Sequence, residues 1–220
     1  MRNLRSRSLF LPLWLLLAGC EHAETHDETA TISEPVNVVV VDVGSGDVEL
    51  FGADVSEVRL LARIEGPSNH LAYEVADGRL QVFDECHESH CSVDVSAVVP
   101  AGVRVELRTG SGDIEVQDLL GAIELDTGSG DIHGFDLAGV DVSAETGSGD
   151  VVLDVFDPLE RLHVRTGSGD VALDVPAGGY RLDVHTGSGD RDLGGVKSDS
   201  GAAASIEVDT GSGDVVIRGR

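Results

Sequence analysis

Apolar and polar residues alternate along most of the chain from Val36 to Arg220. An alternation with a period of two and one apolar face is typical of a half-buried β-strand. In six places such a run leads into the pentapeptide TGSGD, and the alternation resumes after its Asp. Each repeat is therefore predicted to be a strand, a TGSGD corner and a second strand. The residues predicted to face inward are Val105, Leu107, Ile114, Val116, Ile123, Leu125, Val142, Ala144, Val151, Leu153, Leu162, Val164, Val171, Leu173, Leu182, Val184, Ile206, Val208, Val215 and Ile217.

The corners recur at a nearly constant interval. The TGSGD copies begin at Thr109, Thr127, Thr146, Thr166, Thr186 and Thr210, and a seventh copy, VGSGD, begins at Val43. A period near 20 residues is typical of a stacked repeat architecture. The two glycines allow positive φ, and the Asp can accept backbone N–H groups in a turn. A motif present six times is architectural, so the six serines are not predicted to be nucleophiles and no enzyme activity is expected.

Three features depart from the repeat. Gly134 stands where an inward side chain is expected, and Arg191 stands where the other copies have Val or Ile. The rungs that contain them are predicted to be the weakest. The third departure is the insert from Gly194 to Ser205, in the most widely spaced repeat.

The region from Val36 to Pro100 is β-rich but less regular. It contains the VGSGD corner, and an Asp77-Gly78 pair separates two alternating runs, which is a strong signal for a β-hairpin. We interpret residues 36–100 as the N-terminal cap that a repeat protein needs, ahead of the TGSGD repeats at 101–220.

These elements predict an all-β fold. No segment carries the apolar stripe of a helix, so no helix is available to cover a sheet. Coiling the strands into rungs lets their inner faces bury one another, so we predict a right-handed parallel β-solenoid of about seven rungs; an antiparallel barrel or sandwich is the alternative. The chain ends soon after its last corner, so Val215–Ile217 is predicted to expose an unpaired edge, guarded by Arg218 and Arg220.

The N-terminus carries an export signal. Residues 1–19 combine arginines with a short apolar run, which indicates a signal peptide. The sequence LAGC that ends at Cys20 resembles the lipobox of bacterial lipoproteins, and the resemblance implies an acylated Cys20; Glu21 after it implies sorting to the outer membrane. The alternative is an ordinary signal peptide. Residues 20–35 are acidic and are predicted to form a flexible tether between lipid and domain.

Net charge and cysteines limit the partners. The formal net charge of -25 repels nucleic acid and anionic membrane surfaces, so a nucleic-acid partner is excluded. In the sequence CHESHC, Cys86 and Cys91 are predicted to form a disulfide in an oxidising compartment. The alternative is a zinc or copper site made from Cys86, His87, His90 and Cys91.

The corner aspartates are the candidate cation ligands. In stacked rungs they form a column that we predict to bind divalent cations weakly, with calcium as the candidate; alternatively, backbone N–H groups satisfy these carboxylates. No other cofactor is predicted. The column consists of Asp113, Asp131, Asp150, Asp170, Asp190 and Asp214.

The lipobox, the VGSGD opening, the strand ending in VVPAG at residues 98–102 and the serial TGSGD copies together resemble a bacterial β-strand-repeat family of unknown function, catalogued as putative adhesins. The resemblance covers Val36 to Arg220 and implies the fold, but it transfers no functional residue. We predict a lipid-anchored, non-enzymatic binding or adhesion scaffold. It would be an outer-membrane lipoprotein facing the periplasm or cell surface, bound to an unknown envelope protein or surface ligand. The alternatives are a structural or regulatory envelope module acting through a protein partner, and a cation-binding repeat protein.

Overall fold

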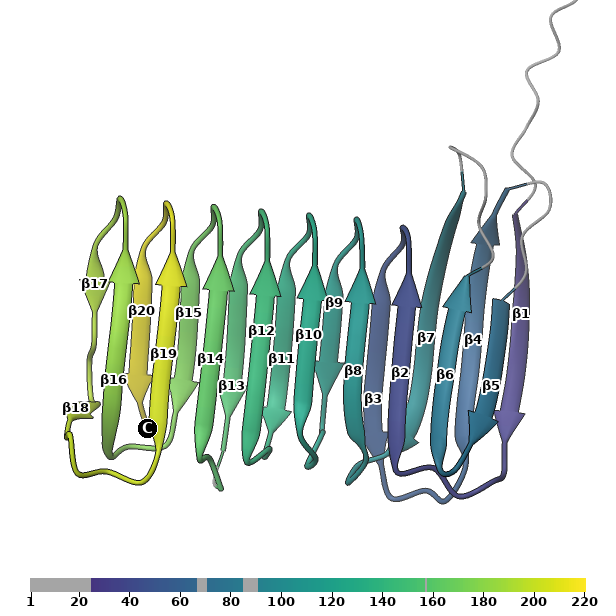
Figure 1. Cartoon of the computed structure of the whole chain (residues 1–220), viewed down its shortest axis with the longest axis horizontal. Coiled ribbons are helices and arrows are strands. Elements are labelled where there is room, and N and C mark those ends of the chain that lie inside the picture. Colours follow the sequence, from purple (N-terminus) through teal and green to yellow (C-terminus); the bar gives the residue numbers. More distant parts are fainter. Residues whose placement is uncertain (1–24, 67–70, 85–90, 157) are drawn as a thin grey trace, which may run out of the picture.

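The structure, a computed structural model, describes residues 25–66, 71–84, 91–156 and 158–220, and these form two sheets of ten strands each (Figure 1). Sheet A has the order β1-β4-β7-β3-β9-β11-β13-β15-β20-β17, and sheet B has the order β18-β16-β19-β14-β12-β10-β8-β2-β6-β5. The strands are β1 Thr25–Ile32, β2 Val38–Val43, β3 Val48–Ala53, β4 Val58–Glu65, β5 Leu71–Ala76, β6 Arg79–Asp84, β7 Ser92–Pro100, β8 Arg104–Thr109, β9 Ile114–Gln117, β10 Ile123–Thr127, β11 Ile132–Leu137, β12 Asp141–Thr146, β13 Val151–Val155, β14 Arg161–Thr166, β15 Val171–Val175, β16 Gly179–Thr186, β17 Arg191–Asp192, β18 Lys197–Ser198, β19 Ser205–Thr210 and β20 Val215–Gly219.

The repeats form a parallel β-solenoid, as predicted. Each corner carries the chain from a strand of sheet B to a strand of sheet A, and equivalent residues of successive rungs lie side by side: Thr127 aligns with Thr109 and Thr146. In Figure 1 the chain rises in the nearer sheet and descends in the farther one while moving toward its C-terminal end, so the regular turns are right-handed.

The core lies between the two sheets and is mainly aliphatic. The predicted inward residues are buried, apart from Leu182, which is half-buried. Leu182 belongs to the rung β16–β17 at one end of the stack, where no further rung covers it. The alternating pattern therefore identified the core correctly, and the exception follows from position in the stack.

Gly134 does not leave a gap in the core. Asp136 adopts φ 53° and the register of β11 shifts between Gly134 and Leu137. This bulge turns Leu137 inward, where it is fully buried, and a Cβ on Gly134 would lie 2.7 Å from both Leu137 and Leu153. The bulge thus replaces the missing side chain with Leu137, and the prediction that this rung is among the weakest stays a prediction.

The last rung is not at the end of the stack. Strand β19 lies between β14 and β16, and β20 lies between β15 and β17. The predicted unpaired edge at Val215–Ile217 is therefore wrong. The insert, residues 194–205, carries the chain back below β16, and β19 then pairs with β14 (Figure 1). The outermost rung is therefore β16–β17.

Arg191 closes this outer end. Its guanidinium Nη1 donates to the carbonyl oxygen of Val184, 2.9 Å away, on the edge of β16 that faces away from β19. Strand β18 covers only Gly179 and Tyr180 of that edge. An inward-pointing charge at an edge strand discourages further strand pairing. That this rung is the weakest stays a prediction.

The opposite end is closed by antiparallel strands. Strands β4 and β1 extend sheet A beyond β7, and β5 extends sheet B beyond β6. The Asp77-Gly78 turn joins β5 and β6 with φ values of 51° and 75°, as a tight hairpin requires. The prediction that residues 20–35 form a flexible tether is wrong for residues 25–32, which form β1 and pair along the whole of β4. They are ordered because the edge of β4 satisfies their backbone groups and because Ile32 is buried in the core.

Candidate functional site

The corner motif is used to stack the rungs. The Thr side chains point inward, and each hydroxyl donates to the carbonyl oxygen of the second glycine in the adjacent corner; Thr146 Oγ1 lies 3.0 Å from Gly130 O. The glycines are needed where adjacent corners approach. A Cβ on Gly149, which has φ 155°, would lie 2.0 Å from the carbonyl oxygen of Gly130. No other residue fits there without moving the backbone.

The corner aspartates form the predicted column, and each carboxylate except that of Asp190, at the outer end, accepts a backbone N–H from the next aspartate. Asp131 Oδ1 lies 2.8 Å from Asp150 N, and Asp150 Oδ1 lies 2.7 Å from Asp170 N. The same bond recurs through Asp113, Asp214 and Asp190. The residues that the structure describes contain no group of three or more His, Cys, Asp or Glu side chains arranged to hold a metal ion. Weak calcium binding by the column stays a prediction.

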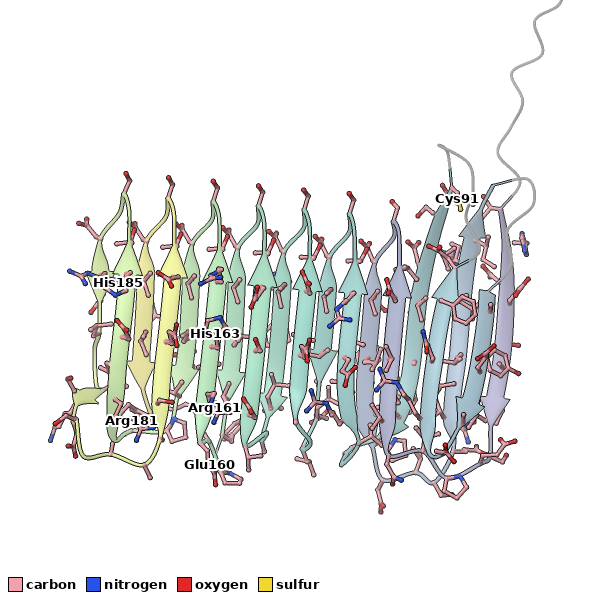
Figure 2. The ribbon with its side chains drawn as sticks, in the orientation of Figure 1. Cys91, Glu160, Arg161, His163, Arg181 and His185 are labelled. Atoms are coloured by element: carbon pink, nitrogen blue, oxygen red, sulfur yellow. The ribbon has the colours of Figure 1, made fainter. Side chains whose placement is uncertain are left out.

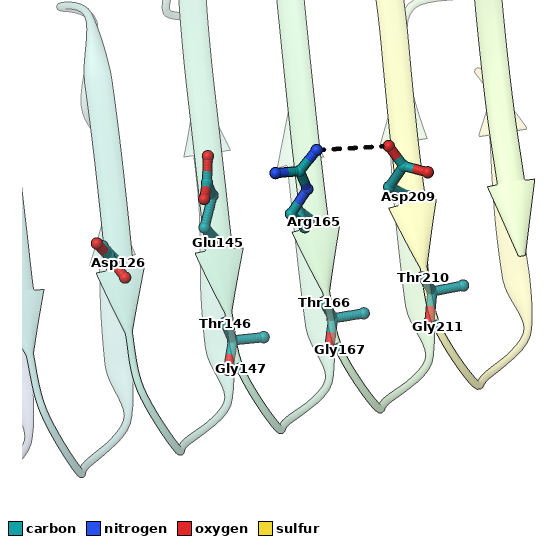
Figure 3. Close-up of a pocket in the computed structure, with 10 residues that line it drawn as sticks. All are labelled: Asp126, Glu145, Thr146, Gly147, Arg165, Thr166, Gly167, Asp209, Thr210 and Gly211. Carbon is teal, nitrogen blue, oxygen red and sulfur yellow. Dashed lines mark ion pairs between the residues drawn. The ribbon is translucent and has the colours of Figure 1, made fainter. Parts of the chain in front are cut away.

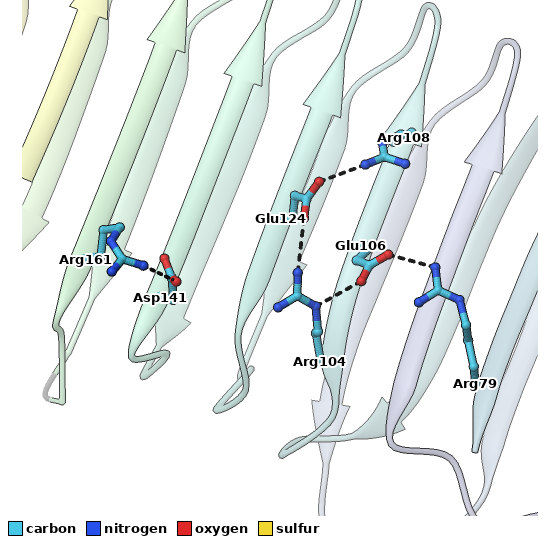
Figure 4. Close-up of polar contacts among 7 residues, drawn as sticks. All are labelled: Arg79, Arg104, Glu106, Arg108, Glu124, Asp141 and Arg161. Atoms are coloured by element: carbon cyan, nitrogen blue, oxygen red, sulfur yellow. Dashed lines mark hydrogen bonds and ion pairs between the residues drawn. The ribbon is translucent and has the colours of Figure 1, made fainter. Parts of the chain in front are cut away.

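The outer face of sheet B carries a network of ion pairs (Figure 4). Glu106 Oε2 lies 2.8 Å from Arg79 Nη2, and its Oε1 lies 2.9 Å from Arg104 Nε. Arg104 also contacts Glu124 at 3.2 Å, and Arg108 contacts the other oxygen of Glu124 at 2.8 Å. The network joins the cap strand β6 to β8 and β10 of the repeats. Sequence reasoning missed it, although these residues occupy the polar positions of the alternation.

Glu106 is the most buried carboxylate of this network, with a side chain 15% exposed. The hydrogen bond from Arg79 lowers the pKa of Glu106, burial opposes this effect, and the bond from Arg104 adds to it. The hydrogen bond to Glu106 in turn raises the pKa of Arg104. The network therefore favours the charged forms of both groups, as expected of a structural ion-pair cluster.

A groove of about 560 Å³ crosses sheet B beside the corners (Figure 3). Arg165 and Asp209 face each other in it, with Nη2 and Oδ2 3.7 Å apart. The groove offers the carboxylates of Asp126, Glu145 and Asp209 and the guanidinium of Arg165 as charged binding groups. It is lined by Asp126, Glu145, Thr146, Gly147, Arg165, Thr166, Gly167, Asp209, Thr210 and Gly211.

Two histidines lie on the same face (Figure 2). His163 Nε2 is 3.5 Å from Glu145 and its Nδ1 is 3.8 Å from Glu207, while His185 Nε2 is 2.8 Å from Asp183. His163 lies between acidic side chains of the adjacent strands β12 and β19, whereas His185 and Asp183 lie on the same strand, β16.

The cysteine predictions fall mostly outside the described residues. Cys20, Cys86, His87 and His90 lie there, and Cys91, at the start of the segment that contains β7, is disulfide-bonded. The pairing of Cys91 with Cys86 stays a prediction, which an intact mass two hydrogens below that of the reduced chain would check. Within the described ranges, no helix has the length and apolar character needed to cross a membrane.

The chain belongs to the Toastrack DUF4097 family, whose model matches residues 36–218. It resembles the crystal structure of a "putative cell adhesion protein" from Clostridium sporogenes, with a TM-score of 0.51 and 11% identity over 90% of this chain and 100% of that one. It also resembles a "putative adhesin" from Bacteroides fragilis, with a TM-score of 0.50 and 11% identity over 89% and 97% of the two chains. At this identity the likeness shows the fold alone. No curated protein matches the chain.

Proposed function

We propose that this protein is a non-enzymatic, lipid-anchored scaffold of the bacterial cell envelope that binds a partner through the outer face of one of its sheets. One observation carries the proposal: the polar groups of the repeated motif are used within the stack. The Thr hydroxyls bind neighbouring carbonyl groups and the Asp carboxylates bind neighbouring N–H groups. The repeats therefore build two long faces, and a partner meets the side chains on those faces.

The names of the structural neighbours support an adhesive role. The relatives from Clostridium sporogenes and Bacteroides fragilis are described as a putative cell adhesion protein and a putative adhesin. A flat face of mixed charge and apolar side chains is suited to binding another macromolecule and gives no enclosed space in which to exclude water from a reaction.

The anchor also fits the fold. Thr25 begins β1 only five positions after Cys20, and an extended chain spans about 3.5 Å per residue, so acylation would hold the β1 end within about 18 Å of the lipid. The chain between Cys20 and β1 is thus shorter than the tether of residues 20–35 that the sequence predicts, and the β1 end of the solenoid would stand nearest the membrane.

The binding proposal is tested with purified protein and isolated bacterial envelopes. Three variant sets are compared with wild type: Glu49→Lys with Glu115→Lys on sheet A, Arg108→Glu with Arg165→Glu on sheet B, and Ser148→Ala with Ser168→Ala on the exposed crest of the corners. We expect one of the two face sets to abolish envelope binding and the crest set to leave it unchanged. Binding that survives both face sets, or that is lost with the crest set, would contradict the proposal.

The anchor is tested separately by metabolic labelling with a fatty-acid analogue. Wild type should incorporate the label and fractionate with membranes, and Cys20→Ser should do neither. Equal labelling of the variant and wild type would refute acylation at Cys20.

A further inference from the structure

Three of the four phenylalanines that the structure describes lie on the outer face of sheet A. The described core contains no phenylalanine, although this side chain is usually among the most buried. Phe51, Phe135 and Phe156 occupy outward positions along β3, β11 and the end of β13 in sheet A, whereas Phe83 is the counterpart on sheet B. Phe135 is 38% exposed and Phe156 is 42% exposed. We call Phe51, Phe135 and Phe156, with the outward residues around them, the phenylalanine face.

The strands that carry this face supply carboxylates but no lysine or arginine, although Arg59 and Arg63 of β4 and Arg218 of β20 flank it on the neighbouring strands. The six adjacent strands β7, β3, β9, β11, β13 and β15 contain no Lys or Arg, and their outward positions include Glu49, Glu115 and Asp174. Sheet B differs, because five of its outward arginines are already paired with acidic side chains: Arg79, Arg104, Arg108, Arg161 and Arg165. The phenylalanine face therefore combines two exposed aromatic rings and the half-buried ring of Phe51 with carboxylates that lack cationic partners on their own strands.

One contact shows how a cation sits on this face. The guanidinium carbon of Arg220 lies 4.1 Å from the centre of the Phe156 ring, and Arg220 Nη1 donates to Asp154 Oδ2 at 2.9 Å. The chain's own C-terminal arginine thus combines a cation–π contact with an ion pair. Phe51 and Phe135 could accept the same kind of cation–π contact, but their strands, β3 and β11, contain no Lys or Arg to make it.

The spacing of these two rings is fixed by the sheet. Phe51 and Phe135 both align with Gln117, on opposite sides of β9. Two strand spacings separate them, which is about 9.6 Å. In a polyproline II segment, residues three apart lie on the same side and about 9.3 Å from each other, so such a segment crossing the strands would bring successive arginines over both rings.

We propose that the phenylalanine face docks an extended, arginine-bearing segment of a protein partner, with guanidinium groups placed over Phe51 and Phe135 as Arg220 is placed over Phe156. The negative charge disfavours a nucleic acid or an anionic lipid surface on this face. The inference rests on the proposed binding function and names the face and the partner chemistry.

The test uses the full chain and a fluorescent peptide of four Arg-Pro-Pro repeats, with binding followed by anisotropy. Four Glu-Pro-Pro repeats serve as the charge control. Wild type should bind the arginine peptide and not the glutamate peptide. The double variant Phe51→Ser/Phe135→Ser should weaken binding by about fivefold or more, because each exposed cation–π contact accounts for roughly two- to fivefold. Phe83→Ser, the matched change on sheet B, should leave the Kd within about twofold.

Two further variants keep the test decisive. Phe51→Tyr/Phe135→Tyr retains both rings and should retain binding, which separates loss of the rings from loss of the fold. Glu115→Gln should weaken binding, whereas Glu207→Gln on sheet B should not. The proposal is overturned if the glutamate peptide binds as well as the arginine peptide, or if Phe83→Ser weakens binding as much as the double variant does.

The envelope assay distinguishes this inference from the broader function. If Phe51→Ser/Phe135→Ser leaves envelope binding intact while charge reversal on sheet B abolishes it, the scaffold function holds and the phenylalanine face is not the site. If neither face affects envelope binding, the scaffold function itself fails.

Discussion

The interior rung β12–β13 and the outermost rung β16–β17 share the TGSGD corner but differ in what surrounds them. Rung β12–β13 has a parallel neighbour on each side, and Val151 and Leu153 are buried. In β16–β17 the two equivalent positions after the corner are taken by Arg191 and by Leu193, which is 37% exposed. The corner thus sets the shape of the turn, whereas full burial of the residues that follow it depends on a further rung on each side.

The core between the two sheets is open at each end of the solenoid, and the two ends cover it with different elements. The N-terminal end is closed by β1, whose inward positions include His26 and Glu28, 3.4 Å apart, and Glu28 accepts the backbone N–H of Leu71. The C-terminal end is closed by Arg191. Both ends place charge over the core opening, which hinders end-to-end association of copies.

The largest effect is expected from truncating equivalent leucines. Leu153→Ala removes a side chain packed on both sides and should lower the free energy of unfolding by about 2–5 kcal/mol. Leu193→Ala, at the equivalent position of the outer rung, should cost less than about 1 kcal/mol, because its site is already open to solvent. Urea denaturation of both variants checks this. Equal losses would show that the outer rung is as well packed as the interior.

Corner glycines give the next largest difference. A Cβ on Gly147 would lie 2.5 Å from the carbonyl oxygen of Gly128, whereas at Gly44 the nearest atom is Asp84 Oδ2 at 3.6 Å. Gly147→Ala should therefore destabilise by about 1–3 kcal/mol, and Gly44→Ala by no more than about 0.5 kcal/mol. Thermal unfolding followed by circular dichroism measures both. A Gly44→Ala variant as unstable as Gly147→Ala would contradict this account of stacking.

The ion-pair network should make stability depend on pH. The pKa of Glu106 is lowered from its ordinary value of 4.5, so its contribution is fully present above that value and is lost as the pH falls through the folded-state pKa. Because its arginine partners are exposed, Glu106→Gln should cost only about 0.5–1 kcal/mol at pH 7, and the difference from wild type should disappear in acid. Asp209→Asn, which breaks a single exposed pair, should change little. A constant difference across the pH range would exclude the ionised Glu106 as its cause.

A smaller change in stability is expected at Arg191. Arg191→Val restores the residue type found at interior corners and should alter the free energy of unfolding by no more than about 0.5 kcal/mol. It also removes the charge at the open edge, so the variant should form larger species than wild type in sedimentation at equal concentration. Identical sedimentation of the variant and wild type would show that Arg191 does not prevent association through the open edge of the outermost rung.

Calcium should have the smallest effect. One oxygen of each interior column carboxylate already accepts an N–H group, so weak binding at the other oxygen should raise the Tm only slightly in calcium relative to chelator at matched ionic strength. Asp150→Asn/Asp170→Asn should abolish the rise. The absence of any shift in wild type would remove the cation-binding prediction.

Local pattern was sufficient to predict the repeating unit. The inward residues, the corners and the Asp77-Gly78 hairpin follow from alternation and turn chemistry, which act over a few residues. The strand β1 was missed because its sequence is polar: the edge of β4, far along the chain, satisfies its backbone. The bulge that turns Leu137 inward also depends on the space left between neighbouring rungs.

The sequence by itself determined the strand–corner–strand unit and its parallel stacking, because two glycines at every corner and an inward Thr at each TGSGD copy favour close, in-register neighbours. The order of the rungs was decided by the tertiary structure. Strands β14 and β16 pair with β19 in the same register, through Leu162 and Leu182 on either side of Ile206, so each edge is complementary to several strands. When local complementarity is shared by every repeat, the connections and the packing of the whole stack select which rungs become neighbours.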